Sequence, residues 1–180
     1  MRSLVFLLTT LFAAPVIAAG PTPRPAPELA FKNARKGPDL ALSQFRGKIV
    51  ALALTHTTCD HCQFLTHDLN KIQKDYAAKN VIMVECAFNA DVVLTLPPFM
   101  HDVAPAFPMG YTTDAEIKKF LKWNDKLDGM LYIPYMLFID EKGIIQYDRN
   151  GRDGFFVDGE KNIRAILDKM VKPAAPAKKK

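Results

Sequence analysis

The chain has 180 residues, a formal net charge of +5 and three cysteines. Three is an odd number and too few for a disulfide-stapled scaffold, and the charge is too small to indicate nucleic-acid binding. Much of the basic excess lies in the last three lysines of segment 172–180, which follow a Pro- and Ala-rich stretch and predict a solvated, disordered tail. The remaining length suits one domain with its own core.

The first residues follow the pattern of a secretory signal peptide. Arg2 supplies one positive charge, an apolar run over 4–12 follows, and small residues end the segment at Ala19. Pro15 interrupts the apolar stretch, which falls short of the ~20 residues of a membrane-spanning helix. We therefore expect 1–19 to be a cleaved signal peptide and the mature protein to be periplasmic or secreted, with no stable membrane insertion. A retained anchor is the alternative.

A Pro-rich stretch over 20–27 predicts an extended linker. The domain expected over 28–171 begins with a short hairpin of strands at 30–33 and 40–42. An apolar run over 49–55 then predicts a central parallel strand, because both of its faces are apolar.

The next stretch predicts a helix from Cys59 to about residue 78. Apolar side chains recur in it at three- and four-residue spacing, which indicates one buried face. They are Phe64, Leu65, Leu69, Ile72 and Tyr76. A strand over 81–88 completes a βαβ unit.

A long segment separates this unit from the end of the domain, over 89–129. Thr113, with Glu116 three residues later, forms a capping box that predicts a helix over 113–123.

The last part of the domain is predicted to be a hairpin and a helix. Strands over 135–140 and 144–147 flank a tight Glu-Lys-Gly turn. The helix is expected over 158–171. Its apolar face consists of Ile163, Ile166, Leu167 and Met170.

The chemistry of the chain is indicated by Cys59 and Cys62. Two cysteines separated by two residues, between a buried strand and a helix, are typical of a redox couple. Cys59 lies at the helix N-terminus, where unpaired N–H groups favour its thiolate, so we expect it to attack and Cys62 to resolve the mixed disulfide. A structural disulfide or half of a zinc site is the alternative. Cys86 is expected to be an inert buried thiol, or else a third redox thiol.

The two residues between the cysteines are expected to act in opposite directions. His61 is a cationic neighbour that stabilises the thiolate and so raises the reduction potential, whereas Asp60 repels the thiolate. We therefore expect an intermediate potential. A solvated turn with screened charges is the alternative.

The order of elements around this motif is that of the thioredoxin fold, and the sequence resembles its exported TlpA/ResA-like branch. The resemblance spans roughly 28–170 and is carried by three blocks. They are Phe45-Arg46-Gly47-Lys48-Ile49-Val50, Thr57-Thr58-Cys59-Asp60-His61-Cys62-Gln63 and Ile133-Pro134-Tyr135-Met136-Leu137-Phe138-Ile139-Asp140, the last followed by Glu141-Lys142-Gly143.

This resemblance implies an α/β, thioredoxin-like fold with a central mixed sheet flanked by helices. It implies an insert between the second strand of the βαβ unit and the strand that follows Pro134. It also implies that Pro134 is preceded by a cis peptide bond and faces the redox pair. We expect the backbone of Ile133 to pair with an extended substrate peptide.

The chain departs from the family where a proton acceptor is usual. Ala53 stands in place of the buried Asp of thioredoxin, and Leu65 in place of a Glu found in some members. Thr58 replaces the Trp that many members place before the first cysteine. Glu85 and His56 are the candidates to replace the missing acid.

We therefore expect an exported thiol–disulfide oxidoreductase that needs no cofactor. Its expected partners are protein substrates bearing disulfides or thiols and a redox partner protein, with no nucleic acid. The alternative is a copper- or zinc-binding or interaction module without exchange activity, with His101 as a further ligand.

Two other classes fail on spacing. Covalent haem attachment needs a histidine where Gln63 stands. The P-x-x-x-T-x-x-C pattern of peroxiredoxins would place Pro and Thr where this chain has Leu52 and His56.

Overall fold

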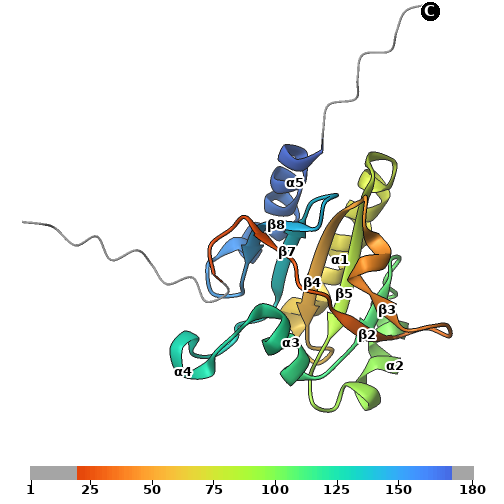
Figure 1. Cartoon of the computed structure of the whole chain (residues 1–180). Helices are drawn as coiled ribbons and strands as arrows, with labels where there is room; N and C mark the ends of the chain where they lie inside the picture. Colours follow the sequence, from red (N-terminus) through yellow and green to blue (C-terminus); the bar gives the residue numbers. More distant parts are fainter. Residues whose placement is uncertain (1–19, 172–180) are drawn as a thin grey trace, which may run out of the picture.

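The computed structural model describes residues 20–171, so the predicted signal peptide (1–19) and tail (172–180) lie outside the described residues. Over that range the chain forms a mixed sheet of eight strands flanked by helices (Figure 1). Within the same part of the chain, no helix is both long enough and apolar enough to cross a membrane.

The βαβ unit predicted from the sequence forms the centre of the sheet. β4 (Ile49–Thr55) runs parallel to β5 (Val81–Ala87), and α1 (Asp60–Tyr76) connects them. β7 (Tyr135–Ile139) lies antiparallel on the other side of β4. β4 is buried along its whole length because it is central and both faces of the sheet are covered.

The sheet extends from this centre in both directions. Next to β7 lie β8 (Ile144–Arg149) and then β1 (Arg24–Pro25), both antiparallel to their neighbours. Next to β5 lies β6 (Met109–Tyr111), which is parallel to β5. Then follow β2 (Ala30–Asn33) and β3 (Leu40–Ala41), which form the predicted hairpin.

Within the Pro-rich segment 20–27, expected to be a linker, β1 is an edge strand of the sheet. β1 pairs with β8, and Arg24 anchors it: the guanidinium Nη2 lies 2.7 Å from Asp148 Oδ2. The Tyr135 hydroxyl donates to the same carboxylate at 3.3 Å. Backbone pairing and a partly buried ion pair therefore hold this segment on the sheet.

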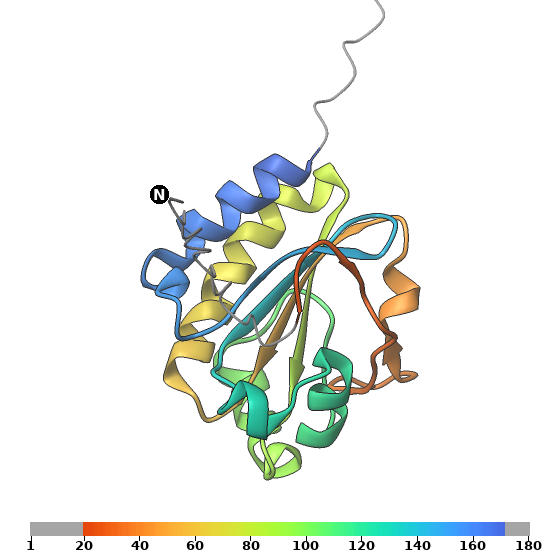
Figure 2. The same cartoon turned by 60° about the vertical axis from the view of Figure 1, so that its left-hand side comes forward.

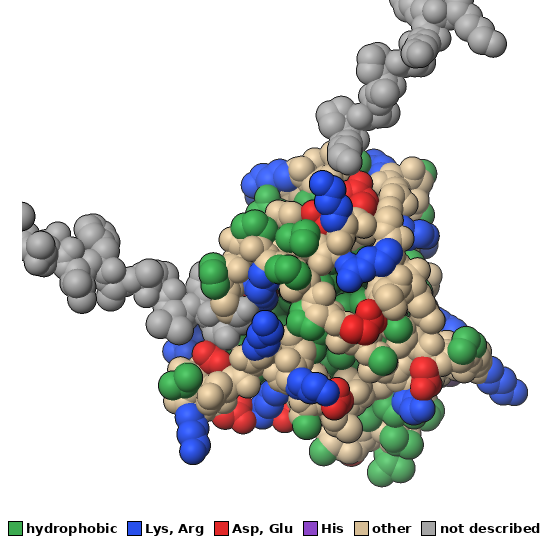
Figure 3. Space-filling model, viewed as in Figure 1, with side chains coloured by type: hydrophobic (Ala, Val, Ile, Leu, Met, Phe, Trp, Pro, Cys, Tyr) green, Lys and Arg blue, Asp and Glu red, His purple; other side chains and the backbone are tan. Residues whose placement is uncertain are grey.

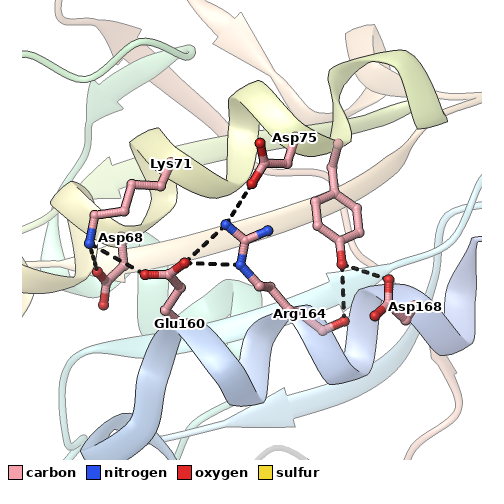
Figure 4. A network of polar contacts seen from close by, with 7 residues as sticks. Asp68, Lys71, Asp75, Glu160, Arg164 and Asp168 are labelled. Carbon is pink, nitrogen blue, oxygen red and sulfur yellow. Dashed lines mark hydrogen bonds and ion pairs between the residues drawn. The ribbon is translucent and has the colours of Figure 1, made fainter.

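Two helices lie side by side on one face of the sheet (Figure 2). α1 and α5 (Gly159–Met170) share an apolar core with β4 and β7. Figure 4 shows a polar network between the two helices. It comprises Asp68, Lys71, Asp75, Tyr76, Glu160, Arg164 and Asp168. At its centre, Arg164 Nη2 lies 2.7 Å from Asp75 Oδ2 and 3.0 Å from Glu160 Oε1. Surface ion pairs contribute only about 0.2–1 kcal/mol each, so apolar burial supplies most of the attraction.

The other face is covered by α3 (Asp114–Leu121), which lies in the insert. Its apolar side chains pack in the core formed with β4, β5 and β7. The predicted N-cap is present: the Glu116 N–H donates to the Thr113 hydroxyl at 3.3 Å. The insert between β5 and β7 is thus part of the domain, and β6 adds a strand to the sheet.

Two helices of the insert are not predicted by the sequence. α2 (Val92–Asp102) contains Pro97 and Pro98, which lack the N–H donor of a helix interior and argue against a helix in the sequence pattern. Its buried side chains form a small separate core that offsets the lost hydrogen bonds. α4 (Asp125–Asp128) is too short to show a periodicity. Short 3₁₀ turns lie at Leu42–Phe45, Ala77–Lys79 and Phe155–Asp158.

One predicted core residue of α1 is wrong. Phe64 is 68% exposed, whereas Leu65, Leu69, Ile72 and Tyr76 are buried. Phe64 and Leu65 are adjacent, and neighbouring residues on a helix differ by about 100° in direction, so both cannot lie at the centre of one buried face.

Candidate active site

The two cysteines lie where β4 leads into α1. Cys59 is the N-cap of α1, and its Sγ accepts a hydrogen bond from the Cys62 backbone N–H at 3.2 Å. Both cysteines are free thiols here; Cys59 is partly exposed and Cys62 is fully buried. A reagent in solution therefore reaches Cys59 and not Cys62.

The pKa values of the two thiols are shifted in opposite directions. The hydrogen bond from the Cys62 thiol lowers the pKa of Cys59 to about 6, with further help from the Cys62 backbone N–H and the charge of His61, and against the effect of burial. The same thiol–thiol hydrogen bond, together with burial, raises the pKa of Cys62. The pair therefore holds a thiolate at Cys59 and a thiol at Cys62 near neutral pH.

His61 and Asp60 are both exposed in the first turn of α1. The charge of His61 lowers the pKa of Cys59, and its effect on the reduction potential stays a prediction. An acidic side chain in the first turn is also favourable for the helix dipole. The opposing effect of Asp60 on the couple stays a prediction.

A carboxyl group reaches α1 from the neighbouring strand. Glu85 on β5 is fully buried and pairs in register with Ala53 on β4. Ala53 occupies the position at which thioredoxin has its buried acid. Thr55 and Thr66 donate to its carboxylate at 2.8 and 3.0 Å. Glu85 is therefore one strand away from the expected place of the acid, which is about 4.8 Å in a sheet.

Burial favours the neutral form of Glu85, and the groups around its carboxyl can satisfy that form. The Thr66 hydroxyl lies 3.0 Å from both carboxyl oxygens of Glu85 and 2.9 Å from the Cys62 carbonyl oxygen, but it has only one hydrogen to donate. When Glu85 is protonated it can donate to Thr66, which then donates to Cys62, so every polar group has a partner. Burial raises the pKa of Glu85 to about 7, against the lowering effect of the two threonine hydrogen bonds.

His56, the other candidate for the missing acid, is held differently. Its ring packs edge-on against Phe88 with centroids 4.5 Å apart, and its backbone carbonyl accepts from the Cys59 N–H at 3.2 Å. Burial lowers the pKa of this imidazole. His56 thus supports the loop before Cys59 mainly through packing and its backbone.

The loop before Cys59 is fixed by a polar network that the sequence reasoning missed. Asn89, which follows β5, accepts from the Thr57 backbone N–H at 3.0 Å and donates to the Thr57 hydroxyl at 3.0 Å. Thr95 on α2 lies 2.6 Å from that hydroxyl, and Gln63 on α1 donates to the Thr57 carbonyl at 3.1 Å. The available signal was an asparagine directly after a buried strand, at the sheet end that carries Cys59.

Pro134 lies at the same end of the sheet. The peptide bond before it is cis, as predicted, and Tyr135 pairs with Leu54 near the end of β4. Pro134 is buried and Ile133 is partly exposed. The pairing of Ile133 with a substrate peptide stays a prediction.

Two other residues with potential chemistry lie apart from this site. Cys86 is buried on β5, where burial raises the pKa of its thiol. His101 lies in the last turn of α2, exposed, and contacts Asp102 at 2.8 Å. Over residues 20–171, no group of three or more His, Cys, Asp and Glu side chains is arranged to hold a metal ion.

Comparisons with known proteins agree with this geometry. The model of the AhpC/TSA family matches residues 23–148. A putative thiol:disulfide interchange protein DsbE from Chlorobium tepidum has a solved structure with a TM-score of 0.62 at 22% identity, covering 81% of this chain and 96% of that one. The thioredoxin domain of a thiol-disulfide oxidoreductase from Bacteroides vulgatus gives 0.68 at 16% identity, covering 84% of this chain and 99% of that one.

A thiol:disulfide interchange protein from a Bacteroides species also gives a TM-score of 0.68 at 16% identity, over 89% of this chain and 96% of that one. A search of proteins with curated descriptions found no match. At these identities the likeness establishes the fold, and the predicted α/β, thioredoxin-like architecture is confirmed.

The pH at which Cys59 ionises is directly testable. The rate of alkylation of the reduced protein by iodoacetamide should rise with pH to a plateau with a midpoint near 6, because the thiolate is the nucleophile. His61→Ala should move the midpoint upward, since a cationic neighbour is lost. The same change at the exposed His67 on the same helix is the control and should leave the midpoint in place. A wild-type midpoint near 8.5, the usual cysteine value, would contradict the assignment.

Glu85 should make stability depend on pH. Its pKa of about 7 in the folded protein lies above the ordinary value of 4.5, so the folded state binds the proton more tightly than the unfolded state. The contribution of Glu85 to the free energy of unfolding should therefore fall as pH rises from about 4.5 to about 7, by roughly 3 kcal/mol at most. Glu85→Gln cannot ionise, so its stability relative to wild type should increase across that window.

Urea unfolding of both proteins at several pH values measures this difference. The same change at the exposed Glu116 is the control for a surface substitution. If the difference in unfolding free energy between wild type and Glu85→Gln stays constant from pH 4 to pH 8, Glu85 is not buried as a neutral acid.

Proposed function

Because the chain belongs to the AhpC/TSA family, we propose that it is a thiol–disulfide oxidoreductase acting on protein thiols and disulfides through Cys59 and Cys62. The observation that carries this proposal is the asymmetry of the pair. Cys59 is partly exposed and has a pKa near 6, whereas Cys62 is buried one helical turn away with a raised pKa. One thiol is suited to attack and the other to resolve.

The first step is attack by the Cys59 thiolate on a sulfur of the client disulfide. A bond forms between Cys59 Sγ and that sulfur, and the client S–S bond breaks. The other client sulfur leaves as a thiolate and takes a proton from solvent. The product is a mixed disulfide between Cys59 and the client.

The second step needs the Cys62 thiol to lose its proton. Its sulfur then attacks Cys59 Sγ and the mixed disulfide breaks. The client sulfur leaves as a thiolate and takes a proton from solvent, so the client departs with two thiols. Cys59 and Cys62 are left as a disulfide, so two electrons have passed to the client. The reverse sequence oxidises a dithiol client, and the direction depends on the partner and on the redox poise of the compartment.

We assign Glu85 as the proton acceptor for Cys62. The charge of an ionised Glu85 raises the pKa of the Cys62 thiol. When Cys62 passes its proton to an ionised Glu85, the buried region still carries one negative charge, now on the Cys62 sulfur. If the proton went to solvent instead, the Cys62 thiolate and the Glu85 carboxylate would both be charged. A pKa near 7 lets Glu85 both take and return this proton.

We also propose that the protein acts outside the cytoplasm, in the periplasm or after secretion, because of the signal-peptide pattern at its N-terminus. Disulfides persist in such compartments. A protein that repeatedly reduces clients there needs a redox partner protein that supplies electrons to the Cys59–Cys62 disulfide. The rival function, a metal-binding or interaction module, predicts no exchange activity.

The roles of the two cysteines can be separated by trapping. Cys62→Ala should accumulate a mixed disulfide with a protein disulfide such as insulin, because the resolving thiol is absent. Cys59→Ala should trap none, and Cys86→Ala should turn over like wild type. Non-reducing electrophoresis with mass spectrometry measures the adduct. Equal trapping by the Cys59 and Cys62 variants would rule out the assignment, and an absence of exchange in wild type would rule out the function.

The role of Glu85 can be tested on the second step alone. In single turnover with a protein disulfide, Glu85→Gln should resolve the mixed disulfide about 100-fold more slowly at neutral pH, because general base assistance is lost. The deficit should shrink at high pH, where hydroxide deprotonates Cys62. Acid quenching at successive times measures the mixed disulfide. Resolution at the wild-type rate would show that Glu85 is not the acceptor.

A further inference from the structure

A hollow of about 730 Å³ lies beside the redox site, and the reaction described above does not use it. β4, β5 and β6 run parallel, so their carboxyl ends share one end of the sheet. The hollow lies at the ends of β5 and β6, next to the end of β4 that leads to Cys59. Ligands of open α/β sheets bind outside the carboxyl ends of parallel strands, and cavities of this volume are typical of binding sites.

Residues that line the hollow directly contact the loop before Cys59. Phe88 lines the hollow, and its ring packs on His56, whose carbonyl accepts from the Cys59 N–H. Asn89 also lines it and is hydrogen-bonded to Thr57. The hollow and Cys59 therefore belong to one connected part of the molecule.

The mouth of the hollow is apolar where a helix start is usually polar. Val93 lines the hollow and is 64% exposed, and the adjacent Leu94 is 79% exposed. Both lie in the first turn of α2. Hydrophobic side chains gather at the lower edge of the molecule, where α2 lies (Figure 3). Contiguous exposed apolar side chains next to a hollow are typical of an interaction site.

The charged groups at the rim already have partners. Lys32 Nζ lies 2.7 Å from Asp39 Oδ2, and Lys118 Nζ lies 2.9 Å from Asp114 Oδ2. Lys32, Asp39 and Asp114 all line the hollow. With these charges compensated, the hollow favours an apolar group over an anion or a cation.

We propose that this hollow is a specificity subsite for the protein client, and this rests on the proposed function. It accepts an apolar side chain about three residues from the client cysteine that reacts with Cys59. Two strand spacings separate β4 from β6, or about 10 Å, and an extended peptide advances about 3.3 Å per residue. About three residues of extended peptide therefore cover the distance from β4 to β6. A client strand that passes Ile133 and reaches Cys59 would continue over the end of β5 towards the hollow.

Peptides with a single cysteine test this proposal. The cysteine of each peptide carries a thionitrobenzoate leaving group. In one pair of peptides, the residue about three positions N-terminal to the cysteine is either Leu or Ser. In a second pair, the residue about three positions C-terminal to the cysteine is either Leu or Ser. Release of the chromophore by the reduced protein gives the second-order rate constant. For one of the two sides, wild type should favour Leu over Ser by about tenfold, the scale on which apolar pockets discriminate.

Two variants should abolish this preference. Val93→Asp places a charge at the mouth, and Ala115→Phe fills the hollow from α3. Val157→Asp is the matched control, because Val157 is 86% exposed and lies outside the hollow in the 3₁₀ turn before α5. It should keep the preference. The rate of reaction with the small disulfide dithiobis(nitrobenzoic acid) should be the same in all three variants as in wild type. An unchanged rate also shows that each variant is folded.

The outcomes separate the two proposals. If wild type reacts equally fast with Leu and Ser peptides on both sides, or if Val157→Asp loses the preference as fully as Val93→Asp, the subsite is overturned while the exchange function stands. If wild type fails to react with the small disulfide as well, the proposed function is the one that fails.

Discussion

The hydrogen-bonded first turn of α1 is the constraint on which the site depends. β4 is buried on both faces, so its end is fixed by the sheet, and a short loop over 56–58 leads from there into the helix. Cys59 is the residue at which the helix begins, and both its sulfur and its backbone carbonyl accept from the Cys62 N–H, at 3.2 and 2.9 Å. The hydrogen bond from the Cys62 thiol and these backbone N–H groups together lower the pKa of Cys59 to about 6. The same turn therefore starts the helix and stabilises the thiolate.

A buried acid next to that turn is the second constraint. An ionised carboxylate in the core is costly, and the protein keeps Glu85 there by surrounding it with two threonine hydroxyls and by raising its pKa to about 7. Thr66 also contacts the carbonyl of Cys62, so the acid is connected to the first turn of α1. The protonation of Glu85 and that of Cys62 are thus coupled through charge in one buried region.

Patterns that depend only on local spacing were sufficient for much of the fold. The strand over 49–55 was predicted to the residue, because a short run that is apolar on both faces is typical of a central strand. The predictions fail where packing overrides local preference. Pro97 and Pro98 argue against α2, yet its apolar side chains are buried in their own small core. Phe64 matches the helical spacing but points to solvent. The edge strand at Arg24 depends on an ion pair with Asp148, which is distant in sequence.

The sequence by itself indicated the Cys59–Cys62 pair, the thioredoxin-like fold and the cis bond expected before Pro134, because each follows from residues that are neighbours in the chain or from a family pattern. It left the proton acceptor open, since both usual positions, Ala53 and Leu65, lack an acid. Only the tertiary structure decided that Glu85 lies beside Ala53, because the register between two parallel strands is set by the packing of the whole sheet. The hollow next to Cys59 likewise exists only where β2, α2 and α3, which are far apart in sequence, meet at one end of that sheet.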